Sequence, residues 1–255
     1  MRRSFDILTT FLLLGIVSAI PASAQQPPEP QAEPKPAAPP ATQNPAVVDP
    51  RLRPRPADAK ALFRTFAAMS GLEATFEEEK HLALLALPLK SKGHLFFYRR
   101  DQQSPGYLAR HVDEPEPSSV LITPEELRLQ NRDGTEVIDL KRSDKVRNFI
   151  TSLVHVFAGD EAALMKSYEV AFAPEPKDDK NPKDERGWTL TLTPRDKPLN
   201  QMLKSLRLVG TGEAVLRIEI HEPNGDRTVT RIVTANPTRT FDQVEQKRLF
   251  GIDPK

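Results

Sequence analysis

Residues 93–99 read Gly-His-Leu-Phe-Phe-Tyr-Arg, a short run with large apolar side chains at consecutive positions. Aromatic residues are enriched in β-strands, and seven residues is an ordinary strand length. We therefore predict a strand here. Its aromatic side chains lie on both faces, because successive residues of a strand point to opposite sides.

Further strands are predicted on both sides of this run. Upstream, residues 74–80 and 83–89 mix apolar and polar positions, although Pro88 would place the second stretch at an edge or a bulge. Two turn signals, Asn131–Gly134 and Asn224–Asp226, each predict a hairpin. About ten consecutive short strands predict an antiparallel sheet that must curl. The downstream strands are predicted at 107–112, 119–123, 126–130, 136–139, 168–172, 188–193, 205–210, 214–221 and 228–234.

Two amphipathic helices are predicted within this series, at residues 57–72 and 144–157. Asp58 can cap the first helix and Gly71 can end it, while a short third helix is expected after Asp160. A helix with one apolar stripe has to bury it, so we expect these helices to lie across the open side of the curled sheet. The fold class is mainly β with α.

The first 24 residues have the three parts of an export signal. Arg2 and Arg3 precede an apolar run at 7–20, which Ala22-Ser23-Ala24 closes. We predict a signal peptide at residues 1–24 and a periplasmic location in a Gram-negative bacterium; an uncleaved anchor is the alternative. The chain has no cysteine, so it can form no disulfide and cannot be acylated as a lipoprotein at this site.

The 25 prolines are concentrated after this signal. Residues 25–56 contain Pro, Ala, Gln and Glu with almost no large apolar side chain, and such a segment cannot offset its conformational entropy by burial. We predict a disordered linker there, followed by one domain at residues 57–255.

The composition and motifs favour a binding protein over an enzyme. With 36 basic and 35 acidic side chains, the chain lacks the basic surplus of a nucleic-acid binder. The five histidines show no metal-binding spacing, and no nucleophile elbow or phosphate-binding glycine loop is present. Glu77, Glu78 and Glu79 point to alternating faces of a strand, so we interpret them as a solvated edge rather than a paired-carboxylate site.

Several segments follow one another in an informative order. They are the first helix, Ala74-Thr75-Phe76, Gly93-x-Leu95-Phe96-Phe97-x-Arg99, Ser119-Val120-Leu121-Ile122, Ala158-Gly159-Asp160, Leu190-Thr191-Leu192-Thr193-Pro194 and Asn224-Gly225-Asp226. In this order they resemble the LolA family, periplasmic carriers of outer-membrane lipoproteins. The resemblance covers residues 57–254 and depends on the whole set, since no single segment is specific.

The resemblance implies an unclosed antiparallel β-barrel of about eleven strands with an α-helical lid over an apolar cavity for acyl chains. It implies no catalysis, cofactor or metal. Arg99 matches the arginine that bonds the lid when the cavity is empty, with the adjacent Arg100 as the alternative, and Arg110 stands where the family has an aromatic residue. The cavity would be lined by Phe76, Leu95, Phe97 and Leu121, and the lid helices would contribute Phe63, Phe66, Met69, Phe149, Leu153 and Val156.

The resemblance also implies partners: an acylated lipoprotein or lipid as cargo, an inner-membrane ABC exporter that loads the carrier and an outer-membrane acceptor that unloads it. The cargo could instead be a glycolipid or another acylated molecule. We expect a monomer that binds no nucleic acid.

The alternative function is an envelope-stress sensor or scaffold module that uses the same fold to bind lipoproteins or a protein partner. A hydrolase is disfavoured, because no nucleophile–base pattern is present.

Overall fold

The computed structural model describes residues 49–101, 103, 106–142, 144–174 and 186–253; for residues 144–146 and 149 it describes the backbone alone. The predicted signal peptide and most of the predicted linker lie outside these residues.

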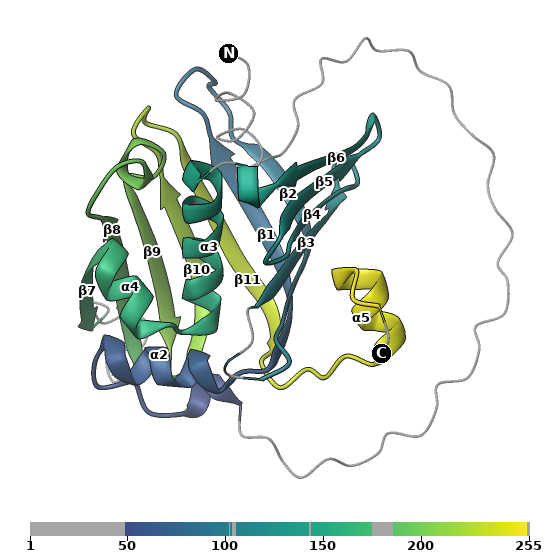
Figure 1. Cartoon of the computed structure of the whole chain (residues 1–255). Helices are drawn as coiled ribbons and strands as arrows, with labels where there is room; N and C mark the ends of the chain where they lie inside the picture. Colours follow the sequence, from purple (N-terminus) through teal and green to yellow (C-terminus); the bar gives the residue numbers. More distant parts are fainter. Residues whose placement is uncertain (1–48, 102, 104–105, 143, 175–185, 254–255) are drawn as a thin grey trace, which may run out of the picture.

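One sheet of eleven antiparallel strands forms the body of the protein (Figure 1). The strands follow the order β6 (Gly134–Asp139), β5 (Glu126–Asn131), β4 (Ser118–Ile122), β3 (Tyr107–Glu114), β2 (Leu89–Tyr98), β1 (Gly71–His81), β11 (Arg227–Asn236), β10 (Ala214–His221), β9 (Ser205–Thr211), β8 (Gly187–Pro194) and β7 (Tyr168–Pro174). Within the described residues, β6 and β7 end the sheet without pairing with each other. The predicted fold, an unclosed barrel of about eleven strands with helices, is therefore confirmed.

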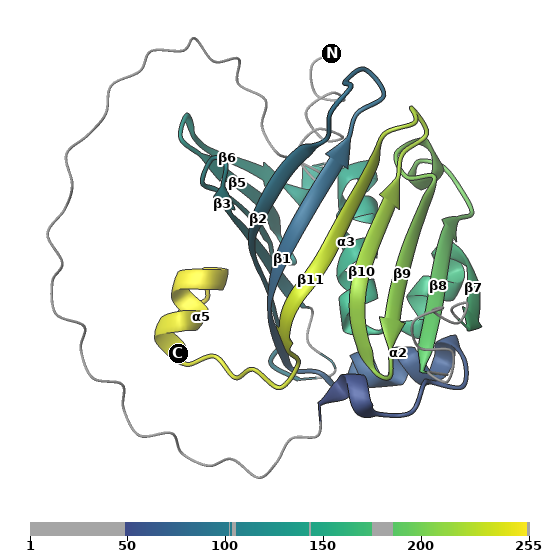
Figure 2. The ribbon, with the colours of Figure 1, turned by 180° about the vertical axis from the view of Figure 1, so that it is seen from behind.

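The concave side of the sheet is covered by helices (Figures 1 and 2). α3 (Asp144–Ala158) lies within the curve, α2 (Ala59–Ala68) crosses one end, and α4 (Glu161–Ser167) links α3 to β7. Asp58 caps α2 by accepting a hydrogen bond from the amide of Ala61 at 2.7 Å. Gly159, at φ +62°, ends α3, and a Cβ there would lie 2.3 Å from the carbonyl oxygen of Phe63. The two helices can therefore approach closely only at a glycine.

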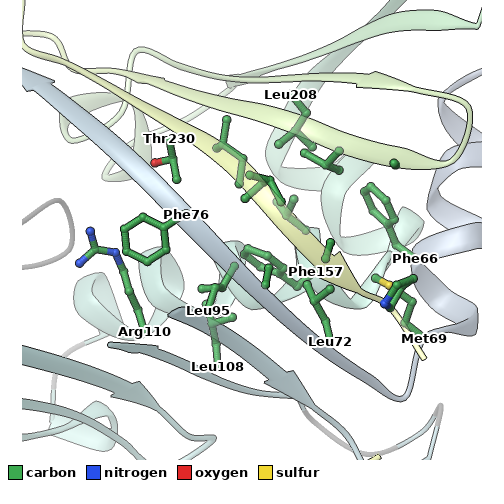
Figure 3. Close-up of a pocket in the computed structure, with 18 of the residues that line it drawn as sticks. Phe66, Met69, Leu72, Phe76, Leu95, Leu108, Arg110, Phe157, Leu208 and Thr230 are labelled. Carbon is green, nitrogen blue, oxygen red and sulfur yellow. The ribbon is translucent and has the colours of Figure 1, made fainter. Parts of the chain in front are cut away.

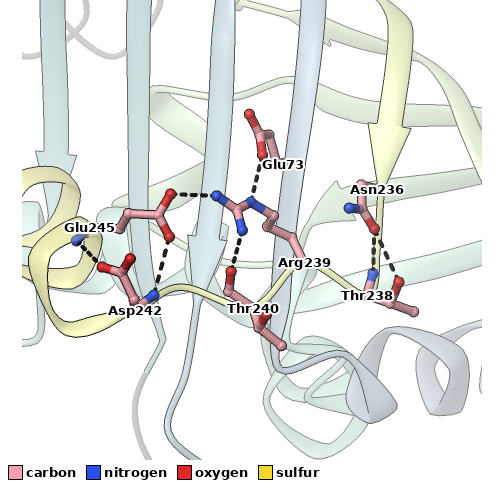
Figure 4. A network of polar contacts seen from close by, with 7 residues as sticks. All are labelled: Glu73, Asn236, Thr238, Arg239, Thr240, Asp242 and Glu245. Carbon is pink, nitrogen blue, oxygen red and sulfur yellow. Dashed lines mark hydrogen bonds and ion pairs between the residues drawn. The ribbon is translucent and has the colours of Figure 1, made fainter. Parts of the chain in front are cut away.

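A further helix covers the opposite, outer face. α5 (Gln243–Phe250) packs Leu249 and Phe250 with Phe96 and Ala109 of β2 and β3, in a cluster separate from the main core. The connecting segment is fixed by Arg239, whose guanidinium bonds Glu73 of β1 at 2.7 Å and Glu245 of α5 (Figure 4). This helix explains the aromatic residues on both faces of residues 93–99, since Leu95 and Phe97 belong to the inner core and Phe96 to the outer cluster.

Three predictions about local structure were wrong, and one helix was not predicted. Residues 83–88 form a loop rather than a strand, with Leu84 97%, Leu85 46% and Leu87 78% exposed, because three leucines without alternation give no single apolar face. The first helix ends at Ala68, and Gly71 begins β1. α5 was not predicted, because its stretch is mostly polar. Residues 50–52, assigned to the linker, form a 3-10 turn, η1 (Pro50–Leu52), against the barrel.

Candidate functional site

An apolar cavity of about 560 Å³ lies between the concave face of the sheet and helices α2 and α3 (Figure 3). Its volume is within the usual range for ligand-binding pockets, about 300–1,000 Å³. Most of its wall is aliphatic or aromatic. The helices contribute Phe66, Leu153, Val156 and Phe157, with Met69 just after α2, and the strands contribute Leu72, Ala74, Phe76, Leu95, Leu108, Val120, Ile122, Leu206, Leu208, Val215, Ile218, Ile220 and Ile232.

The interior is hollow rather than filled. Val215, Ile218 and Ile232 line the cavity, yet each is only partly buried. Side chains in a close-packed core lose nearly all their exposed surface. The apolar faces of the strands and helices therefore enclose a space large enough for a ligand.

One end of the cavity is polar. Glu78 of β1 accepts a hydrogen bond from Arg110 Nη2 at 2.8 Å on one carboxylate oxygen and from the Thr230 hydroxyl at 2.8 Å on the other. The guanidinium of Arg110 also lies over the ring of Phe76, 4.6 Å from its centroid. Glu78 is 7% exposed and the Arg110 side chain is 18% exposed, so most of this ion pair is enclosed by the wall.

The opposite end reaches the surface beside residues 49–53, which we call the strap. Asp49, Arg51, Thr234 and Ala235 line this end and are exposed. The strap is held by the hydrogen bond from the Glu213 amide to the Pro50 carbonyl oxygen at 2.9 Å and by the Arg53–Glu213 ion pair at 2.7 Å.

Gly212 allows the strap to dock. It has φ +55°, and a Cβ there would lie 2.4 Å from the carbonyl oxygen of Pro50 and 2.7 Å from that of Arg53. A side chain at this position would therefore be both strained and in collision with the strap.

Arg99 joins the sheet to the ends of α2 and α3. Its Nε donates to the carbonyl oxygen of Met69 at 2.8 Å, and Nη1 donates to that of Ala158 at 3.3 Å; Nη2 bonds the carbonyl oxygen of Ala67. The residue is 4% exposed, and this burial lowers the pKa of Arg99, while Asp101 acts in the opposite direction. Arg100 is exposed. The geometry required of a latch is present at Arg99; the latching role itself stays a prediction.

The structure brings most of the predicted site residues together. Phe76, Leu95, Phe66, Met69, Leu153 and Val156 all line the cavity. Phe97 and Phe63 point inward but lie fully buried behind the wall, where the ring of Phe97 stacks on Phe157 with centroids 6.3 Å apart. The side chain of Phe149 lies outside the described part of the structure.

Leu121 lies on the wrong face for the predicted role. It is paired with Ala109 and packs in the outer cluster beneath α5, whereas its neighbours Val120 and Ile122 line the cavity. Ser119–Ile122 carries apolar residues on both faces because α5 covers the outer one. The alternation of side chains could not by itself identify the inner face.

Sequence reasoning also missed the polar end of the cavity. Glu78 was interpreted as part of a solvated edge, but it points inward while Glu77 and Glu79 do not line the cavity. The available signal was Arg110, a cation where the resembling family has an aromatic residue. An inward cation on one strand requires a carboxylate partner on another.

No metal-binding group of three or more His, Asp or Glu side chains occurs within the part of the chain that the structure describes. Among the same residues, no helix has the length and apolar character needed to cross a membrane.

Comparison with protein families gives a match to the outer membrane lipoprotein carrier protein LolA-like family over residues 52–247. This chain belongs to that family. The LolA-like chain has no match among curated proteins. The family assignment agrees with a lipid- or lipoprotein-binding carrier fold.

Solved structures resemble the LolA-like chain at low identity. The Pseudomonas aeruginosa MucA/MucB complex matches with 15% identity and a TM-score of 0.40, covering 74% of this chain and 60% of that chain. A DUF1329 family protein from Desulfovibrio piger matches with 11% identity and a TM-score of 0.44, covering 76% of this chain and 99% of that chain. A LolA superfamily protein from Nitrosomonas europaea matches with 11% identity and a TM-score of 0.37, covering 72% of this chain and 94% of that chain.

Proposed function

We propose that this LolA-like protein is a periplasmic carrier that shields the acyl chains of lipoproteins or related lipids and transfers them from the inner to the outer membrane. One observation carries the proposal: a cavity of about 560 Å³ whose wall is mostly apolar. Such a wall offers hydrocarbon a surrounding comparable to the bilayer interior.

A carrier is needed because acyl chains leave a membrane slowly. Each buried methylene contributes roughly 0.8 kcal/mol to membrane binding, and a second chain makes anchoring stable. A soluble carrier has to offer a similar gain and then release the cargo. The Arg99 bonds to the ends of α2 and α3 support release by lid opening, since they are few and all come from one side chain.

The proposed route begins at an inner-membrane ABC exporter, which loads the cavity, and ends at an outer-membrane acceptor. The support for these two partners is family membership alone. The predicted export signal supports the periplasmic location.

Binding of a fluorescent fatty-acid probe to the purified protein tests the proposal. Ile218→Trp places a large side chain in the cavity, and Val137→Trp is the matched control, because Val137 is 52% exposed and does not line the cavity. We expect stoichiometric probe binding by the unmodified protein and by the control, and at least tenfold weaker binding by Ile218→Trp. Absence of probe binding by the unmodified protein, together with no co-purified lipid in mass spectra, would refute the carrier function.

A further inference from the structure

The two ends of the cavity differ in chemistry. At one end, Arg51, Thr234 and Ala235 are exposed, so the cavity opens to solvent there. At the other end the wall contains Glu78, Arg110 and Thr230. Figure 3 shows Arg110 and Thr230 at one side of the cavity, and Phe66 and Met69 at the opposite side. The cavity thus has an open mouth and a polar end.

The polar end is rigid and internally bonded. Glu78 and Thr230 are direct partners across β1 and β11, and Leu95 and Arg110 are partners across β2 and β3, so sheet register fixes the positions of both charges. Both oxygens of the Glu78 carboxylate accept hydrogen bonds, one from Arg110 and one from Thr230. Removing one member of a buried pair is strongly unfavourable, so hydrocarbon cannot push the two charges apart.

A second buried pair, Lys80 and Glu222, lies beyond Glu78 and Arg110 on the side away from the mouth. Lys80 follows Glu78 on the same face of β1, is 7% exposed and has its ammonium nitrogen 4.0 Å from a carboxylate oxygen of Glu222. Glu222 is 2% exposed. On β1 and β3, the apolar part of the cavity wall therefore ends at Glu78 and Arg110.

We propose that the Glu78–Arg110 pair, with Thr230, is a polar stop that sets the length of the acyl chain the cavity accepts, with the methyl end of the chain toward the pair and its polar linkage at the mouth beside the strap. The proposal rests on the carrier function. Chain atoms that fit between mouth and stop replace water by apolar wall, whereas atoms beyond that length meet a bonded ion pair and gain no apolar contact.

A series of saturated fatty acids of increasing length tests the stop, with affinity measured by displacement of the fluorescent probe. For the unmodified protein we expect affinity to rise about fourfold per methylene, the equivalent of ~0.8 kcal/mol, up to one length and then to stay constant.

Two double variants decide whether the charges set that length. Glu78→Leu with Arg110→Leu makes the end apolar and is compatible with folding, because apolar replacement of a buried ion pair is often neutral or stabilising. We expect its limiting length to increase by at least two methylenes. Glu78→Gln with Arg110→Gln keeps the end polar without charge, and we expect its limiting length to match the unmodified protein. If the leucine variant has the same limiting chain length as the unmodified protein, the proposal that the pair is a polar stop is wrong.

A measurement on the unmodified protein tests the orientation and needs no variant to fold. A fatty acid with a photoreactive group at its methyl end should cross-link to Phe76, Arg110 or Val120, as located by mass spectrometry. Cross-links at Arg51 or Thr234 instead would place the carboxylate at Arg110 and overturn the proposal.

These outcomes are separable from failure of the carrier function. If the unmodified protein binds no fatty acid of any length, the carrier proposal fails and the stop fails with it. If binding is normal but the leucine variant shows no longer limit, only the stop fails.

Discussion

Arg99 Nε, just after β2, donates a hydrogen bond to the carbonyl oxygen of Met69, just after α2, at 2.8 Å. The same guanidinium bonds the carbonyl oxygen of Ala158 at the end of α3. Helix C-termini carry partial negative charge and unpaired carbonyl groups, so one cation can satisfy both helices at once. The ends of α2 and α3 are thereby tied to one side chain of the sheet.

Replacing Arg99 by Met should weaken the attachment of α2 and α3 to the sheet. The change leaves several buried carbonyl oxygens without a charged donor, and we expect the free energy of unfolding to fall by about 2–4 kcal/mol, with faster exchange of a bound acyl probe. Chemical denaturation and stopped-flow probe exchange measure the two effects. Arg100→Met is the control, because Arg100 is exposed. Equal exchange rates in both variants would contradict the latch.

The face assignment of two leucines predicts opposite results for the same substitution. Leu95→Glu puts an unpaired carboxylate into the cavity wall, so we expect acyl-probe binding to be lost. Leu121→Glu disturbs the contact beneath α5 and should lower stability, but leave probe binding within about twofold of the original. Loss of binding in the second variant, with its circular dichroism spectrum unchanged, would show that the assignment is wrong.

The strap depends on the absence of a side chain at Gly212. Gly212→Ala adds a Cβ that meets the strap carbonyls, and we expect destabilisation of about 1–3 kcal/mol and faster tryptic cleavage of the bond between Arg51 and Leu52. Gly134→Ala is the matched control, since Gly134 also has positive φ but no atom lies within 4 Å of the added Cβ. Equal cleavage rates for the strap in both variants would disprove the docking requirement.

His111 should make stability pH-dependent. Burial lowers the pKa of His111 from 6.5; Asp113 opposes this shift, while His94 and Arg248 of α5 reinforce it. Below pH 6.5 the unfolded chain therefore takes up a proton that the folded protein does not. The contribution of neutral, buried His111 to the free energy of unfolding is therefore complete above pH 6.5. It is lost as the pH falls toward the lowered pKa of His111.

Denaturation curves between pH 7.5 and about 5 measure this dependence. His111→Gln should flatten this pH dependence, because it removes the group whose pKa burial lowers. An identical pH profile for His111→Gln and the unmodified protein would rule out His111 as the source.

The strand and helix periodicities were sufficient to predict the architecture. Residues 93–99, the helix stripes around Phe66 and Leu153, and the two hairpin signals are local patterns, and each has only one favourable way to bury its apolar side. The resemblance to the LolA family assigned Phe76, Leu95, Met69 and Val156 to the cavity or its helices, and all four line the cavity.

Residue pairs distant in sequence were not predictable in the same way. Whether Leu121 or Val120 faces inward depended on α5, which covers the outer face more than 100 residues later. Glu78 looked like a surface residue until β1 was aligned with β3 and β11, 32 and 152 residues away.

The sequence by itself determined that this chain forms one curled antiparallel sheet with amphipathic helices across it, because hydrophobic periodicity is a local property. Only the tertiary structure decided that the interior is hollow, that it ends at a buried ion pair and that the strap borders its mouth. Those features arise from strand register and from packing between distant segments, which fix how much space side chains leave unfilled.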